Sequence, residues 1–233
     1  MPHHFPFEAV LFDCDGVLVD SEPITNGVLR DMLQELGWVL TRDECMRIFV
    51  GKAVKDEAGL IAQRTGVAIT QDWLQGFWAR RNAALDRDLV EIPGAPAAVR
   101  ALHATLAGRI ACASGADRGK VVLQLEKIGL LDVFEGRIFS GHETPRSKPF
   151  PDVYLAAAAA LGVDPARCAV VEDTVTGATA GMAAGATVFG YSPGGLGHSS
   201  ADALRAIGVR EVFVDMAQLP ALLAAWRAVP QPG

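Results

Sequence analysis

Two aspartates follow a short apolar stretch near the start of the chain and stand two residues apart. Residues 9–12, with the sequence AVLF, have the length and the composition of a buried strand. Asp13 and Asp15 come directly after it, and Gly16 permits a tight turn. The plainer interpretation is an Asp-Gly turn. However, ligands bind at the carboxyl ends of strands in open parallel sheets, so a buried strand that ends in two carboxylates predicts a ligand site.

Three further groups of polar residues stand at corresponding places later in the chain. Ser114 and Gly115 follow one apolar stretch, Glu172 and Asp173 follow another, and Lys148 lies in the loop between them. Taken singly, these residues are typical of a turn, a helix start and a surface loop. Together they predict one site, because a parallel sheet brings the carboxyl ends of its strands to the same edge.

The charges of this predicted site indicate a cation and a phosphate. Four carboxylates beside one lysine and one serine would repel one another without a cation. Mg²⁺ prefers oxygen ligands and retains several of its waters, which suits an acidic pocket of this kind. A bound phosphate group would then supply the remaining charge. The sequence therefore predicts a Mg²⁺ site that accepts a phosphorylated substrate.

The elements that position these residues follow an alternating order. Short apolar stretches alternate with helical patterns through the second part of the chain, which predicts βαβ units and an α/β fold with a doubly wound parallel sheet. The expected strands are residues 9–12, 109–113, 137–139, 168–171, 186–189 and 212–214. The expected helices include residues 152–161 and 177–185, and the Gly- and Ser-rich residues 191–200 are expected to form a surface loop.

Residues 21–91 show helical patterns only. Thr41 and Glu44 have the spacing of a capping box at a helix start. An aromatic stripe at helical spacing is typical of a core, and its residues are Trp73, Leu74, Phe77 and Trp78. We therefore expect two domains, a core of residues 1–20 and 92–233 and a small helical domain of residues 21–91 inserted after the first strand.

Composition and charge limit the class of partner and the compartment. The chain has 233 residues and a formal net charge of −6, and it has no basic run, which argues against a nucleic-acid partner. No apolar run reaches the length of a membrane span. The four cysteines lack CxxC spacing, which predicts reduced thiols in a cytoplasmic protein. We expect a monomer, and we interpret the adjacent His3 and His4 as incidental rather than metal-binding.

Residues 12–22, with the sequence FDCDGVLVDSE, resemble the signature of the haloacid dehalogenase superfamily, in its phosphatase and β-phosphoglucomutase-like branch. The resemblance runs from about residue 7 to residue 214, and it includes the later Ser114, Lys148 and Glu172-Asp173 motifs. It implies a Rossmann-like core and a helical cap over the active site. It also implies hydrolysis of a small phosphorylated metabolite such as a sugar phosphate or a sugar-acid phosphate.

The resemblance implies a role for each residue of the site. Asp13 would attack phosphorus and form an aspartyl phosphate, and Asp15 would act as general acid and then as general base. Ser114, with backbone N–H groups from Gly115 onward, would hold phosphate oxygens, and Lys148 would neutralise charge on Asp13 and on the transferring group. The implied Mg²⁺ ligands are Asp13, the backbone carbonyl of Asp15 and Asp173, with Glu172 bound directly or one shell further out. Asp20 would stabilise the turn that moves the cap.

Departures from the family pattern concern the substrate. Thr25 stands where a β-phosphoglucomutase has His, and Val54 stands where it has Arg. Gly51, Lys52 and Lys55 are the candidate substrate contacts in the cap. We therefore predict a hydrolase, with a β-phosphoglucomutase-like phosphotransferase as the alternative. A receiver-type phospho-switch is a further alternative, but the second aspartate and the helical insertion argue against it.

Overall fold

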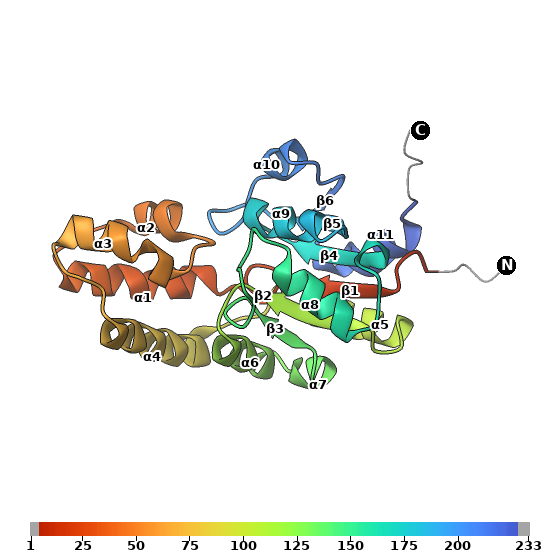
Figure 1. Cartoon of the computed structure of the whole chain (residues 1–233), viewed down its shortest axis with the longest axis horizontal. Coiled ribbons are helices and arrows are strands. Elements are labelled where there is room, and N and C mark those ends of the chain that lie inside the picture. The colour runs from red at the N-terminus through yellow and green to blue at the C-terminus, as the bar shows by residue number, and fades with distance from the viewer. Residues whose placement is uncertain (1–4, 228–233) are drawn as a thin grey trace.

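The computed structural model describes residues 5–227. Within them, the chain forms a parallel sheet of six strands in the order β3-β2-β1-β4-β5-β6 (Figure 1). The strands are β1 (Ala9–Phe12), β2 (Ile110–Ser114), β3 (Ile138–Ser140), β4 (Cys168–Glu172), β5 (Thr187–Tyr191) and β6 (Glu211–Phe213). The predicted α/β fold with a doubly wound parallel sheet is confirmed; β1 has the predicted limits, and the limits of the other strands differ from the predicted ones by at most two residues. Residues His3 and His4 lie outside the described residues.

Alternate side chains of β1 contact different helices on the two faces of the sheet. Val10 and Phe12 belong to one apolar cluster, and Ala9 and Leu11 belong to another. The first cluster includes residues of α5 (Ala95–Thr105), α6 (Arg118–Lys127), α7 (Leu131–Phe134) and α11 (Leu219–Ala225). The second includes residues of α8 (Asp152–Ala160), α9 (Val175–Ala183) and α10 (Ala201–Ala206). The sheet is therefore buried on both faces, as continuous apolar strands require.

The segment between β1 and α5 is helical and has an apolar cluster of its own. It contains α1 (Glu22–Glu35), α2 (Arg42–Phe49), α3 (Ala58–Thr65) and α4 (Gln71–Asp88), with a 3₁₀ turn, η1 (Val54–Glu57). The predicted capping box is confirmed at the start of α2, where Thr41 and Glu44 exchange hydrogen bonds. Figure 1 shows these helices beyond one end of the sheet. The division into domains at residues 20/21 and 91/92 stays a prediction, which the separate apolar cluster supports.

The two chain segments that join these helices to the sheet pair with each other. Asp20 N–H donates to the carbonyl of Val90 at 3.0 Å, and Ile92 N–H donates to the carbonyl of Leu18 at 2.9 Å. Val19 and Glu91 form an antiparallel bridge between these two hydrogen bonds. The backbone of Asp20 thus belongs to the connection, and the role of its side chain stays a prediction.

The segment predicted as a surface loop at residues 191–200 folds back onto the end of β4, so this prediction is wrong for part of it. Tyr191 is a buried end of β5, and Ser192 is 7% exposed. Ser192 Oγ donates to the carbonyl of Ser199, and Ser199 N–H donates to the carbonyl of Asp173. Composition predicts the absence of regular structure but does not indicate where such a segment packs.

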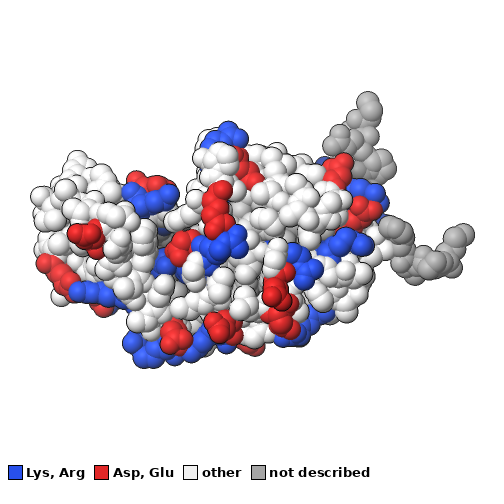
Figure 2. Space-filling view, turned by 60° about the horizontal axis from the view of Figure 1, so that its bottom comes forward, with Lys and Arg blue, Asp and Glu red and all other residues white. Residues whose placement is uncertain are grey.

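The remaining sequence expectations concern surface and thiols. All four cysteines are buried free thiols, as predicted. Among the helices of residues 5–227, none is long and apolar enough to cross a membrane. Figure 2 shows acidic and basic side chains interspersed over one face of the molecule, without a broad basic surface there. Short 3₁₀ turns complete the fold at η2 (Pro165–Arg167) and η3 (Met216–Gln218).

Candidate active site

A cavity of about 380 Å³ lies where the carboxyl ends of the central strands face the helical cap. Its core side includes Asp13 and Asp15 after β1, Ser114 at the end of β2, and Asp173 after β4. Its cap side comes from α1, α4 and the segment between α2 and α3. The residues predicted from strand ends therefore meet in one place, as the parallel topology requires.

Lys148 links two carboxylates across the floor of the cavity. Its Nζ lies 2.8 Å from Asp13 Oδ1 and 2.6 Å from Glu172 Oε1. Tyr154 of α8 donates its hydroxyl to the same Glu172 oxygen at 2.6 Å. Burial alone would lower the pKa of Lys148, but the two carboxylates outweigh burial and raise this pKa well above its usual value. Lys148 is therefore a fixed cation beside Asp13.

The positive charge that the protein places near Asp13 and Asp173 does not balance the negative charge of these two carboxylates when both are ionised. Burial, with contributions from neighbouring carboxylates, raises the pKa of Asp13 to about 7 despite Lys148. Burial and the charges of Glu172 and Asp13 also raise the pKa of Asp173 well above its usual value. Asp173 Oδ1 is buried and has no hydrogen-bond partner among the residues that the structure describes. Oxygens of Asp13, Glu172 and Asp173 lie within 4.8 Å of one another. This donor set fits a hard divalent cation such as Mg²⁺.

Glu172 is more fully engaged than the other two carboxylates. It is completely buried, and its Oε1 accepts from Lys148 and Tyr154. Its Oε2 accepts from the backbone N–H of Asp173 and from the hydroxyl of Thr174, at 3.2 and 3.3 Å. These hydrogen bonds favour a role for Glu172 in fixing Lys148. They also make Glu172 less available as a metal ligand than Asp13 and Asp173.

Asp15 is held by three donors that converge on one of its oxygens. Asp15 Oδ1 accepts from the hydroxyl of Ser21, from Gln124 Nε2 at 2.8 Å and from Lys120 Nζ at 2.7 Å. Burial would raise the pKa of Asp15, but Lys120 together with these hydrogen bonds outweighs burial and lowers the pKa to about 2. Lys120, Gln124 and Ser21 were not predicted from the sequence as residues of the site. The only signal for the first two was a polar pair at i, i+4 in the helix after Ser114.

Ser114 and Gly115 stand between the end of β2 and the start of α6. Ser114 is 1% exposed, and its Oγ accepts from the backbone N–H of Ala116 at 3.1 Å. Ser140 of the neighbouring strand donates to the carbonyl of Ala116 and so fixes the same turn. The three predicted phosphate-binding residues, Ser114, Gly115 and Lys148, all line the cavity. Their binding of phosphate stays a proposal.

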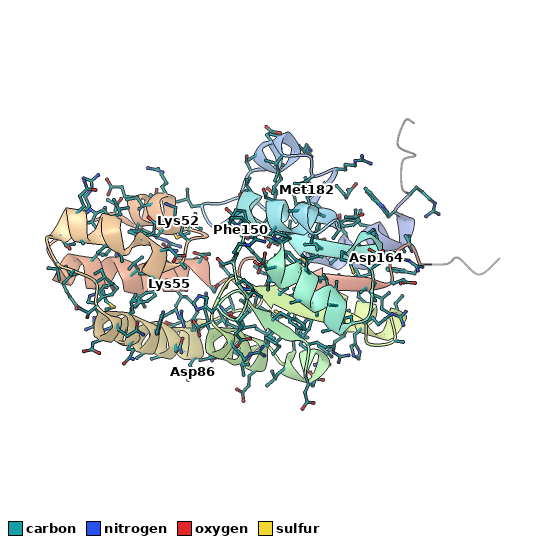
Figure 3. All side chains as sticks on the ribbon, in the orientation of Figure 1. Lys52, Lys55, Asp86, Phe150, Asp164 and Met182 are labelled. Atoms are coloured by element: carbon teal, nitrogen blue, oxygen red, sulfur yellow. The ribbon has the colours of Figure 1, made fainter. Side chains whose placement is uncertain are left out.

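The predicted cap residues Gly51, Lys52 and Lys55 also line the cavity. Figure 3 shows Lys52 and Lys55 on the part of the cap nearest the core. Lys52 pairs with Glu57 within the cap at 3.5 Å. Val54 is 8% exposed and belongs to the apolar cluster of the cap, so it presents only hydrocarbon to the cavity.

Further cavity residues were missed in the cap. Arg81 of α4 donates to Asp117 of the core at 2.9 Å, and its side chain is only 6% exposed. Phe77 and Trp78 of the predicted aromatic stripe line the cavity, so the interpretation of this stripe as core alone was incomplete. The spacing was correct for a helix, but spacing does not distinguish a residue that faces a core from one that faces a cavity.

His198 comes from the segment that folds back onto β4. Its Nε2 lies 3.0 Å from the carbonyl oxygen of Gly16 and 4.0 Å from Asp173 Oδ2. It therefore lies beside the loop that carries Asp15. His198 was not predicted from the sequence, because it stands in a stretch whose composition is typical of a loop.

The fold and the site define a capped α/β protein with a Rossmann-like core, a candidate carboxylate nucleophile and an acidic cluster that could hold a metal ion at the strand ends. The profile of the haloacid dehalogenase-like hydrolases matches residues 7–185, and the chain belongs to this family. It is 33% identical over 183 residues to the 6-phosphogluconate phosphatase of Escherichia coli (strain K12), covering 78% of this chain and 81% of that one.

Two other relatives agree with this assignment. Hexitol phosphatase B of Escherichia coli (strain K12) is 32% identical over 178 residues, covering 76% of this chain and 79% of that one. A haloacid dehalogenase family hydrolase from Deinococcus radiodurans R1, solved with bound phosphate and sodium, is 40% identical with a TM-score of 0.76. That likeness covers 95% of this chain and 96% of that one. The predicted family and the predicted class, a phosphatase, are confirmed.

Proposed function

We propose that the protein is a Mg²⁺-dependent phosphomonoester hydrolase that acts through an aspartyl-phosphate intermediate. The observation that carries the proposal is the separation of two aspartates from one loop into different surroundings. Asp13 lies with Lys148 and the acidic cluster, whereas Asp15 is held apart by donors from α6 and the cap connection. Two carboxylates with different surroundings suit a nucleophile and an acid/base.

The reaction follows from these positions. Lys148 occupies Asp13 Oδ1, so the other oxygen of Asp13 forms the bond to phosphorus as the ester P–O bond breaks. Asp15 takes up a proton once the anionic phosphate ester lies beside it, since a neighbouring negative charge raises its pKa, and it gives this proton to the departing alcohol oxygen. In the second step Asp15 takes a proton from water, whose oxygen attacks phosphorus and releases Asp13 and inorganic phosphate. Mg²⁺, held by Asp13, Asp173 and the carbonyl of Asp15, would neutralise charge on the phosphoryl oxygens.

The proposed substrate is a small phosphorylated polyhydroxyl compound, a sugar phosphate or a sugar-acid phosphate. Two relatives are named for 6-phosphogluconate and for hexitol phosphates. The wall that α1 contributes to the cavity is polar: Asn26 donates to Glu22 Oε2 at 2.7 Å, and Thr25 Oγ1 is buried with no partner within residues 5–227. Such a wall offers donors and acceptors for hydroxyl groups. We further propose that the protein is a monomer and that it is cytoplasmic; the four free thiols support the cytoplasmic location.

The test is a panel of phosphate esters assayed for phosphate release with Mg²⁺, for the wild type and Asp13→Asn. The panel contains sugar phosphates, hexitol phosphates and 6-phosphogluconate. We expect hydrolysis of at least one of them and a loss of roughly 10²-fold or more in Asp13→Asn, which is nearly isosteric. Asp13→Asn with the wild-type rate would refute the nucleophile, and a panel without turnover would refute the substrate class.

A further inference from the structure

The three donors to Asp15 leave its two oxygens in different states. Oδ1 accepts from Ser21, Lys120 and Gln124. No hydrogen bond from residues 5–227 reaches Oδ2. The side chain of Asp15 is 16% exposed and lines the cavity. One oxygen is therefore saturated by the protein, and the other is available to a bound substrate.

Two of these donors come from one face of α6. Lys120 and Gln124 are one turn apart, so their side chains project from the same face of the helix. Both are buried: Lys120 is 5% exposed and Gln124 is 0% exposed. Asp117 fixes the start of this helix, because its side chain accepts from the backbone N–H of Lys120 at 2.9 Å and also binds Arg81 of the cap.

Gln124 has a defined amide orientation because both of its ends are bound. Its Oε1 accepts from Cys14 Sγ at 3.3 Å, and its Nε2 donates to Asp15 Oδ1 at 2.8 Å. The reversed amide would place Gln124 Oε1 against the carboxylate of Asp15, where two acceptors would face each other. Gln124 itself has no exposed surface, so it does not touch a substrate. Any effect that it has on the reaction passes through Asp15.

We propose that Lys120 and Gln124 are positioning residues that hold Asp15 Oδ1 and thereby direct Oδ2 at the ester oxygen that leaves. The proposal rests on the proposed function, in which Asp15 delivers the proton. A carboxyl group that rotates freely presents either oxygen, whereas this arrangement fixes which oxygen carries the proton to the substrate. Such pre-alignment of a catalytic group lowers the entropic part of the barrier.

The test compares two substrates that differ in their need for a proton. An alkyl phosphate, the one hydrolysed fastest in the panel above, has a poor leaving group and needs protonation. p-Nitrophenyl phosphate has a good leaving group and needs little. The variants are Gln124→Leu and Lys120→Met, which remove the donors and approximate the side-chain volumes. Lys127→Met, at the exposed end of the same helix, is the matched control. The readout is kcat/KM, which reports the steps up to release of the alcohol.

We expect Gln124→Leu to lower kcat/KM for the alkyl ester by about tenfold or more, within the range for general acid catalysis, and to change that for p-nitrophenyl phosphate by less than about threefold. Lys120→Met should show the same selectivity with a smaller loss, because it also removes the charge that lowers the pKa of Asp15, and the test remains decisive if one variant does not fold. Lys127→Met should leave both substrates unchanged. Equal losses on the two substrates, or no loss on the alkyl ester, would overturn the proposal in favour of a purely structural pair.

Asp15→Asn separates this proposal from the proposed function. If Asp15→Asn loses kcat/KM selectively on the alkyl ester while Gln124→Leu and Lys120→Met do not, the positioning role is refuted and the acid role stands. If Asp15→Asn loses equally on both substrates, the acid role itself fails, and the positioning proposal fails with it.

Discussion

Gly177, in the first turn of α9, directly faces the carboxylate of Glu172. A Cβ atom at this position would overlap that carboxylate, which is completely buried and bound on both oxygens. In an open helix, Gly→Ala stabilises by roughly 0.5–1 kcal/mol. At residue 177 the overlap must displace Glu172, so we expect the opposite sign.

The size of the effect follows from the hydrogen bonds that Glu172 would lose. Displacement breaks at least the bonds from Lys148 and Tyr154, both 2.6 Å long. Hydrogen bonds to a charged group contribute about 1.5–3 kcal/mol each, so the loss is about 3–6 kcal/mol. After the helix-propensity gain, the free energy of unfolding should fall by about 2–5 kcal/mol. For a protein of this size that corresponds to a Tm lower by about 4–20 °C. Phosphate release should also fall, since displacing a catalytic group by about 1 Å can cost about 10²-fold.

Thermal unfolding followed by circular dichroism, together with phosphate release, measures both effects. Gly76→Ala in α4 is the matched control, because nothing lies within 4 Å of the Cβ position there. This control should keep its activity and gain about 0.5–1 kcal/mol. If Gly177→Ala unfolds at or above the wild-type temperature and keeps its activity, the hydrogen bonds of Glu172 do not hold Lys148 in place.

Three other predictions test the site. Asp173→Ala should raise the Mg²⁺ dissociation constant more than Glu172→Ala does, since Asp173 has an oxygen with no partner among the described residues. Equal dissociation constants from calorimetry would contradict this ranking, and full activity in excess EDTA would contradict the requirement for Mg²⁺. Burial raises the pKa of Glu22 from 4.5 to about 7, so the native state keeps a proton that the unfolded chain releases, and this group's stabilising contribution falls as pH rises from 4.5 to 7. The Tm of Glu22→Gln should therefore increasingly exceed that of the wild type between pH 4.5 and pH 7, and the difference should level off at higher pH. A difference in Tm that does not change with pH would argue against the raised pKa of Glu22. With β-glucose 1-phosphate, Mg²⁺ and a trace of glucose 1,6-bisphosphate, phosphorus NMR should show free phosphate, because Val54 and Thr25 replace the Arg and His of the mutase; accumulation of glucose 6-phosphate would favour the mutase.

The strand ends were predictable because their signal is local. A strand buried on both faces reads as an apolar run, and a polar residue directly after it is conspicuous. Parallel pairing then brings Asp13, Ser114 and Asp173 to one edge without knowledge of any side-chain contact. Ser114 itself still belongs to β2, because it pairs in register with Ser140, and this is why the predicted strand ended one residue early.

The site residues that helices contribute could not be predicted, because no local sequence pattern indicates which distant residues they contact. A lysine or a glutamine in a helix usually faces solvent, and nothing near Gln124 in sequence indicates that it lies against Asp15, 109 residues away. Arg81 shows the same difficulty, since it contacts Asp117 36 residues further along the chain. His198 was hidden in a segment whose composition predicts only a loop.

The paired connection between the sheet and the helical cap has a consequence for how new substrates are acquired. Val19 and Glu91 form an antiparallel bridge, which holds the two ends of the inserted segment together. The entropic cost of closing the loop therefore depends little on how many residues are inserted between them. A short turn from Val19 to Glu91 would complete a hairpin and leave the strand ends in place. Of the three donors to Asp15, two reside in α6 of the core and only Ser21 lies on the connection. We therefore expect that evolution can exchange or reshape the cap, and with it the accepted substrate, while the proposed chemistry at phosphorus is retained.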